Sequence, residues 1–143
     1  MYDDILIPTD GSLSTESVLD HTIEIATGRD ATLHVLYVID DQVFLTLDHE
    51  MKEDVLEDLR YEGEQALERV TDRLDAIGLD VVTSIREGKP AEEIVAYAEK
   101  EDIDIVTMGT QGDEYTENIL GSTSEKVVTR SPVPVLTVNV SGQ

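Results

Sequence analysis

The segment DILIPTDGS, residues 4–12, decides the fold. Its first half is a short apolar run, as expected for a strand that is buried on both faces of a sheet. Its second half, Pro8 to Ser12, contains residues that favour a turn, and Ser12 or Ser14 could cap a following helix. The segment therefore predicts a strand that turns directly into a helix, the first unit of a parallel α/β sheet.

The same alternation of strand and helix continues along all 143 residues. The predicted strands cover 4–8, 31–39, 79–86, 103–108 and 135–140, and the predicted helices cover 14–27, 50–77, a segment opening at Pro90, and 122–130. Helical crossovers between successive strands indicate a single three-layer α/β/α domain over 1–143, with a doubly wound parallel sheet. In such a sheet, ligands bind outside the carboxyl ends of the strands, where the strand order reverses.

The long second helix has a helical spacing of apolar residues that predicts one buried face. The residues of this face are Met51, Val55, Leu59, Ala66, Val70, Leu74 and Ile77. The acidic residues at the start of the same helix are interpreted as a solvated surface. The three histidines show no spacing typical of metal ligands, so no metal site is predicted.

The chain is strongly acidic, with 32 Asp and Glu against 10 Lys and Arg and a formal net charge of -22. Nucleic acids and anionic membranes are bound by clustered cations, so this charge argues against both as partners. No apolar run approaches the length of a membrane span, cysteine is absent, and the first residues lack the positive charge of a signal peptide. We therefore expect a soluble, cytoplasmic protein.

A possible phosphate site lies between the fourth predicted strand and the last helix. GTQG at 109–112 is followed by eight residues and then by GSTS at 121–124. Glycines allow close backbone approach to a ligand, and a helix N-terminus offers free N–H groups to phosphate. Ser122 and Ser124 could add hydroxyl donors. The same residues also match a capping box, with Ser122 as the cap and Glu125 as its partner, and both interpretations stay open.

Asp10 stands at the end of the first predicted strand, beside the expected crevice. Its carboxylate could accept a hydrogen bond from an adenine amine or a ribose hydroxyl, hold Mg²⁺, or act as an acid–base group. It could equally form an Asx-turn or cap a helix. Asp40 and Asp41 are interpreted as turn residues. The motifs of P-loop NTPases, dinucleotide-binding domains and α/β-hydrolases are missing.

Three stretches together resemble the universal stress protein family. They are residues 5–12, residues 87–94 with 104–109, and the region from Gly109 to Leu136 with its PVPVL ending. The resemblance spans nearly the whole chain in the right order. It implies a five-stranded parallel sheet of the adenine nucleotide alpha hydrolase type, with strand order 3-2-1-4-5. It also implies a homodimer through the last strand, Val135 to Val140.

The ATP-binding branch of that family implies a ligand, ATP or another adenine nucleotide such as AMP, with Mg²⁺ as a companion ion. The adenine positions match Pro8, Thr9, Asp10 and Val38, the ribose positions match Met108 and Gly109, and the phosphate positions match Gly112, Gly121, Ser122, Thr123 and Ser124. The implied role is a stress-response or regulatory protein. No catalytic residue is predicted, and at most slow ATP hydrolysis is expected.

The chain departs from the family's ATP-binding pattern in one respect. That pattern is Gly-x2-Gly-x9-Gly-[Ser/Thr], and here the second gap has eight residues, with Asp113 and Glu114 after Gly112. An alternative is therefore a member that has lost nucleotide binding and acts through its dimer and protein partners. An ATP-pyrophosphate synthetase of related topology is disfavoured, because its Ser-Gly-Gly-x-Asp-Ser and His-Ile-Gly-His motifs are absent.

The evenly spread acidity and the low lysine content, four of 143 residues, are typical of proteins adapted to concentrated salt. Screening acts over about 3 Å in molar salt, which removes the repulsion between surface carboxylates. We therefore expect a halophilic source, and we expect the urea unfolding midpoint to be higher in molar KCl than in low salt. Equal midpoints in both would indicate an acidic protein from an ordinary mesophilic source.

Overall fold

The computed structural model describes residues 2–11, 14–110 and 121–139 and contains alternating strands and helices. In chain order the elements are β1 (Asp4–Thr9), α1 (Ser14–Ala26), β2 (Thr32–Asp40), the 3₁₀ helix η1 (Asp41–Phe44), α2 (His49–Asp75), β3 (Asp80–Gly88), α3 (Pro90–Lys100), β4 (Ile105–Gly109), α4 (Ser122–Arg130) and β5 (Val135–Val138). The predicted alternation is confirmed. Val140, at the end of the last predicted strand, lies outside the described residues.

The five strands form one parallel sheet in the order β3-β2-β1-β4-β5, as predicted. The first strand lies in the middle, because the chain adds β2 and β3 on one side of it and then β4 and β5 on the other. Ile5, Leu6 and Ile7 of β1 are completely buried, which explains the continuous apolar run.

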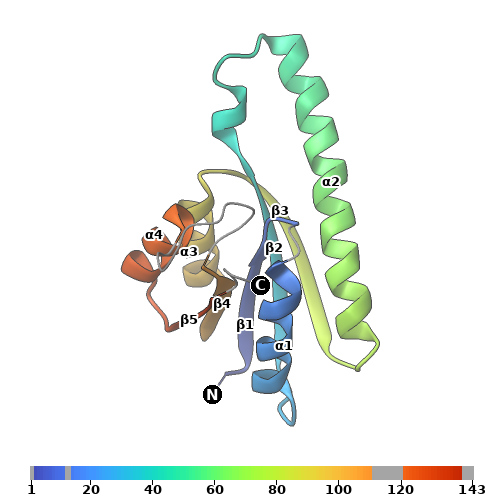
Figure 1. Cartoon of the computed structure of the whole chain (residues 1–143), viewed down its shortest axis with the longest axis vertical. Coiled ribbons are helices and arrows are strands. Elements are labelled where there is room, and N and C mark those ends of the chain that lie inside the picture. Colours follow the sequence, from blue (N-terminus) through green and yellow to red (C-terminus); the bar gives the residue numbers. More distant parts are fainter. Residues whose placement is uncertain (1, 12–13, 111–120, 140–143) are drawn as a thin grey trace.

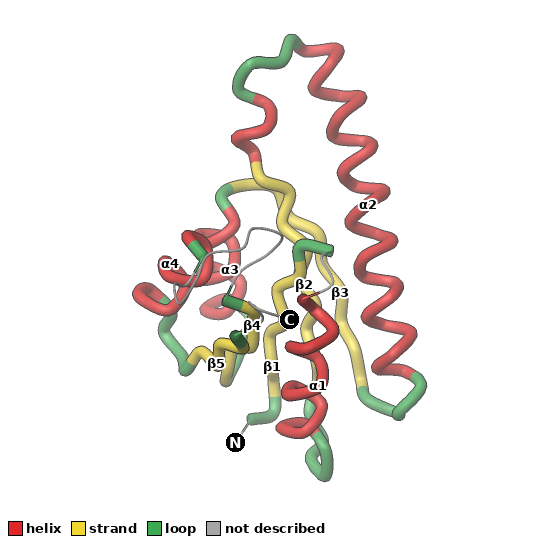
Figure 2. Tube along the Cα trace, in the orientation of Figure 1, coloured by secondary structure: helices red, strands yellow, loops and turns green. Residues whose placement is uncertain are grey.

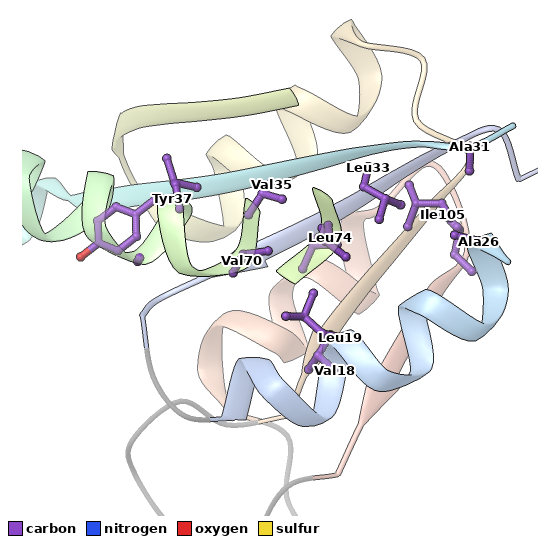
Figure 3. Close-up of a cluster of buried hydrophobic side chains, with 14 of the residues drawn as sticks. Val18, Leu19, Ala26, Ala31, Leu33, Val35, Tyr37, Val70, Leu74 and Ile105 are labelled. Atoms are coloured by element: carbon purple, nitrogen blue, oxygen red, sulfur yellow. The ribbon is translucent and has the colours of Figure 1, made fainter. Parts of the chain in front are cut away.

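Helices cover both faces of the sheet (Figures 1 and 2). The contacts place α1 and α2 on one face, and α3 and α4 on the other. Each face has its own apolar cluster, and successive residues of β2 alternate between the two, as strand geometry requires. In Figure 3, Leu74 and Val70 of α2 lie near Val35 of β2. The sheet is therefore the middle of three layers.

The second helix is longer than the sheet that it covers. Figure 1 shows η1 and the start of α2 projecting beyond the strands, and the first buried residue of α2 is Gly63. Met51 is 51% exposed and Ile77 is 53% exposed, so the prediction that both are buried is wrong. The spacing of Met51 suits the buried face, but the sheet does not extend that far. Ile77 lies beyond the helix end.

A buried histidine links the middle of the sheet to α3. The ring nitrogens of His34 on β2 lie 2.8 Å from the Tyr97 hydroxyl and 3.0 Å from an Asp4 carboxylate oxygen. The guanidinium of Arg86 lies 5.1 Å from the centre of the Tyr97 ring. Burial raises the pKa of the Tyr97 hydroxyl. The imidazole is thus fully engaged in a structural network.

The ring of Tyr37 packs directly on the backbone of α2 at Gly63. A Cβ atom placed on Gly63 would lie 2.7 Å from Cδ1 of Tyr37, too close for any real contact. Burial, followed by repulsion from Glu62 and Asp10, raises the pKa of the Tyr37 hydroxyl. The glycine therefore permits close packing between α2 and β2, although glycine is otherwise unfavourable inside a helix.

We predict that Gly63→Ala lowers the free energy of unfolding by about 1–2 kcal/mol, because the overlap with Tyr37 outweighs the better helix propensity of alanine. Urea unfolding at constant KCl measures the change. Glu64→Ala, at the next and exposed position of α2, is the matched control and should change stability by less than about 0.5 kcal/mol. A Gly63→Ala protein as stable as the wild type would contradict the proposed contact.

Candidate nucleotide-binding site

The strand order reverses between β1 and β4, so the carboxyl ends of these two neighbouring strands mark the expected ligand crevice. Their register pairs Ile5 with Ile105 and Leu6 with Val106. Continuing this register brings the end of β1, followed by Asp10, level with Gly109 and Thr110. Site residues predicted from distant parts of the sequence therefore lie at the same end of the sheet, where the strands have their carboxyl ends.

The end of β1 and the turn after it contain three of the residues predicted to contact adenine, Pro8, Thr9 and Asp10. Pro8 is half-buried and Thr9 is buried at the end of the strand. The Thr9 hydroxyl accepts the backbone N–H of Gly11 at 3.1 Å and lies 2.9 Å from the hydroxyl of Thr15. These bonds fix the turn, so Thr9 has a structural role. Asp10 is exposed at the tip, with its carboxylate near enough to Tyr37 to affect that hydroxyl's pKa.

The predicted site residues of β2 and β4 lie close to the same carboxyl-terminal end of the sheet. Val38 is half-buried near the end of β2, on the face covered by α3 and α4. Met108 is buried and packs in the apolar cluster of that face, whereas Gly109 is partly exposed at the strand end. Met108 is therefore a core residue, and Gly109 offers backbone that a ligand can approach.

The segment between β4 and α4 is joined at its two ends. The N–H of Gly121 donates to the carbonyl oxygen of Thr110, and the Ser124 hydroxyl donates to the carbonyl oxygen of Gly109 at 2.7 Å. The Thr110 hydroxyl is buried and has no hydrogen-bond partner in the described part of the chain. Sequence reasoning did not single out Thr110. Gly112, Asp113 and Glu114 lie outside the described residues.

The predicted capping box at the start of α4 is wrong. Gly121 is the N-cap, Ser122 is the first residue of the helix, and no side chain caps the free N–H groups. The hydroxyl of Ser124 instead reaches back to β4. Because the helix begins one residue after Gly121, Ser122 and Thr123 stand at its open N-terminus, where backbone N–H groups and the helix dipole favour an anion.

A cavity of about 140 Å³ lies between the N-terminal end of α3 and the length of α4, from Ser122 to Arg130. Its lining comes from Asp40, Gln42, Lys89, Pro90, Ala91, Glu92, Ser122, Thr123, Lys126 and Arg130. The side chain of Asp40 accepts the N–H of Gln42 at 3.0 Å, which confirms its role as a turn residue. Sequence reasoning missed the three cations. The one available signal was the spacing of Lys126 and Arg130, one helical turn apart.

The described residues contain no group of three or more His, Asp or Glu side chains arranged to hold a metal ion. They also contain no helix with the length and apolarity needed to cross a membrane.

The polar groups at this end of the sheet suit a phosphorylated nucleoside. Asp10 carries an exposed carboxylate, which accepts hydrogen bonds, the Thr110 hydroxyl has no partner among the described residues, and the start of α4 has N–H groups without a side-chain cap. An unsatisfied buried hydroxyl costs about 1–3 kcal/mol, which a bound ligand with polar groups could recover. The residues present therefore fit a phosphorylated nucleoside.

Sequence comparison identifies relatives of the whole chain. Residues 1–139 match the model of the Universal stress protein family. Universal stress protein MJ0531 of Methanocaldococcus jannaschii is 39% identical over 140 residues, covering 96% of this chain and 82% of the relative. A universal stress protein of Methanothermobacter thermautotrophicus is 36% identical over 138 residues, covering 94% of both chains.

Structure comparison agrees with the sequence. The solved structure of protein MJ0577, from the same Methanocaldococcus species, superposes with a TM-score of 0.92 at 34% identity, covering 100% of this chain and 99% of the other. The fold is shared by a universal stress protein solved in complex with cAMP (TM-score 0.70, 24% identity, 98% of both chains). It is also shared by an Arabidopsis thaliana family protein with AMP bound (TM-score 0.73, 18% identity, 97% and 92%). The chain belongs to the universal stress protein family.

Proposed function

We propose that this protein binds an adenine nucleotide, ATP or AMP, at the carboxyl ends of β1 and β4. The observation that carries the proposal is the buried Thr110 hydroxyl, which has no partner in the described structure and lies level with Asp10 where the strand order reverses. The two nucleotide complexes with the same fold support it. Asp10 would hold the nucleoside, and Gly121 and Ser122 at the start of α4 would face the phosphates.

The nucleotide would act as a regulatory ligand. A ligand shifts a protein toward whichever conformation binds it more tightly, and partners can respond to that conformation. We propose a stress-response role of this kind in the cytoplasm, with no more than slow ATP hydrolysis. Mg²⁺ would accompany the phosphates as a counter-ion.

Calorimetric titration with AMP, and with ATP and Mg²⁺, in molar KCl tests nucleotide binding. We predict that Asp10→Asn weakens AMP and ATP by the same factor, about tenfold, because a carboxylate is a stronger acceptor than an amide. Asp30→Asn changes the charge equally at an exposed position that precedes β2, at the opposite end of the sheet, and should leave both affinities unchanged.

An absence of binding heat, with no nucleotide retained through purification, would reject the proposal. It would favour a family member that acts through its dimer and its protein partners alone.

We further propose that two copies of the chain pair along β5. This strand lies at the edge of the sheet, and Val135, Leu136, Thr137 and Val138 are all half-buried. The carbonyl oxygens of Pro134 and Val138 accept the N–H groups of Val106 in β4 and of Thr110, the residue after β4. Because backbone groups alternate sides along a strand, those of Val135 and Thr137 point away from β4, where a partner strand could bond to them.

We predict that Thr137→Pro yields a monomer, because proline removes an outward N–H group without disturbing the bonds to β4. Thr137→Val keeps that N–H group and should stay dimeric. Light scattering after gel filtration measures both masses, and circular dichroism checks that both variants are folded. Identical masses for the two variants would contradict pairing through this strand.

A further inference from the structure

The cavity between the N-terminal end of α3 and the length of α4 has an unusual number of cations for this protein. Lys89, Lys126 and Arg130 line it, although the chain has only 10 cations against 32 carboxylates. Among the described residues, none of the three forms an ion pair or a side-chain hydrogen bond, whereas Arg60 and Arg73 both pair with carboxylates. Glu92 lies one turn from Lys89 and also lines the cavity, yet it does not pair with it.

The helix ends reinforce this charge. The N-cap of α3 is Lys89 and that of α4 is Gly121, and neither helix has a side-chain cap. By contrast, the side chains of Asp40 and Asp48 cap η1 and α2. Two uncapped helix N-termini and three unpaired cations thus meet at one cavity (Figure 1 shows α3 and α4 side by side). Lys126 and Arg130 repel one another at this spacing unless an anion lies between them.

The cavity adjoins the proposed nucleotide site at two points. Ser122 and Thr123 line it and also belong to the predicted phosphate positions. Asp40 lines it and lies two residues beyond Val38, on the same face of β2. The carboxylates of Asp40 and Glu92 also line the cavity, so its side chains carry a net charge of only about +1. The dipoles of α3 and α4 add partial positive charge at their N-termini.

We propose that this cavity is a polyphosphate subsite that selects nucleotides with two or more phosphates over AMP. Lys89, Lys126 and Arg130 bind the distal phosphates by charge-assisted hydrogen bonds. This inference rests on the proposed nucleotide site for the position of the nucleoside. These side-chain cations would bind phosphate whatever the length of the segment between β4 and α4.

Binding of AMP, ATP and inorganic tripolyphosphate to Lys126→Gln and Arg130→Gln tests the proposal by calorimetry. Each variant should weaken ATP and tripolyphosphate about five- to tenfold and change AMP less than twofold. Lys100→Gln is the matched control, because Lys100 is exposed, has no described ion pair, and lies at the far end of α3. It makes the same change in net charge and should leave all three affinities unchanged.

The outcomes separate this inference from the proposed function. Equal losses in the Lys100→Gln control, or unchanged affinities in the cavity variants, would overturn the subsite. Binding of AMP and ATP with equal affinity, with no binding of tripolyphosphate, would overturn it and leave the nucleotide site standing. Binding of tripolyphosphate that is weakened by Lys126→Gln and Arg130→Gln, without any nucleotide binding, would support the cavity as a phosphate site and overturn the proposed function.

Discussion

The burial of β1 on both faces is the constraint on which the other elements depend. Ile5, Leu6 and Ile7 are completely buried, so the sheet needs helices on both sides and parallel strands joined by crossovers. The chain satisfies this requirement by adding two strands on each side of β1. As a result, the carboxyl ends of the neighbouring strands β1 and β4 lie where the strand order reverses.

Local patterns in the sequence predicted the elements, and they failed where tertiary packing decides. The apolar run before Pro8 and the spacing of Val70 and Leu74 report only burial, and both predictions agree with the structure. Met51 continues the same spacing but has no sheet to cover. At α4 the capping pattern misplaced the helix start by one residue, because Gly121 and not Ser122 is the N-cap, and the Ser124 hydroxyl bonds to the Gly109 carbonyl oxygen of β4. The predictions of the site residues also succeed where local pattern decides and fail where tertiary packing decides. Asp10 and Gly109 could be placed because strand ends are predictable, whereas Lys89 and Lys126 come together only through the packing of α3 against α4.

Two arginines connect neighbouring secondary-structure elements through exposed ion pairs. Arg73 of α2 bonds to Glu16 and Asp20 and so connects α2 to α1, and Arg60 bonds to Glu87 of β3. These exposed pairs contribute little stability individually, about 1 kcal/mol at most. Within the described part of the chain, the cations of the cavity, Lys89, Lys126 and Arg130, have no such partners.

The paired bonds at the base of the segment after β4 also have an entropic consequence. Because Gly121 bonds to Thr110 and Ser124 bonds to Gly109, the ends of the segment are held together by the sheet and by α4. Closing a loop costs free energy only as the logarithm of its length, and doubling that length adds about 0.6 kcal/mol. Gain or loss of a residue in this segment therefore leaves the fold almost unaffected. The length of this segment can therefore differ among chains that share the same five-stranded sheet.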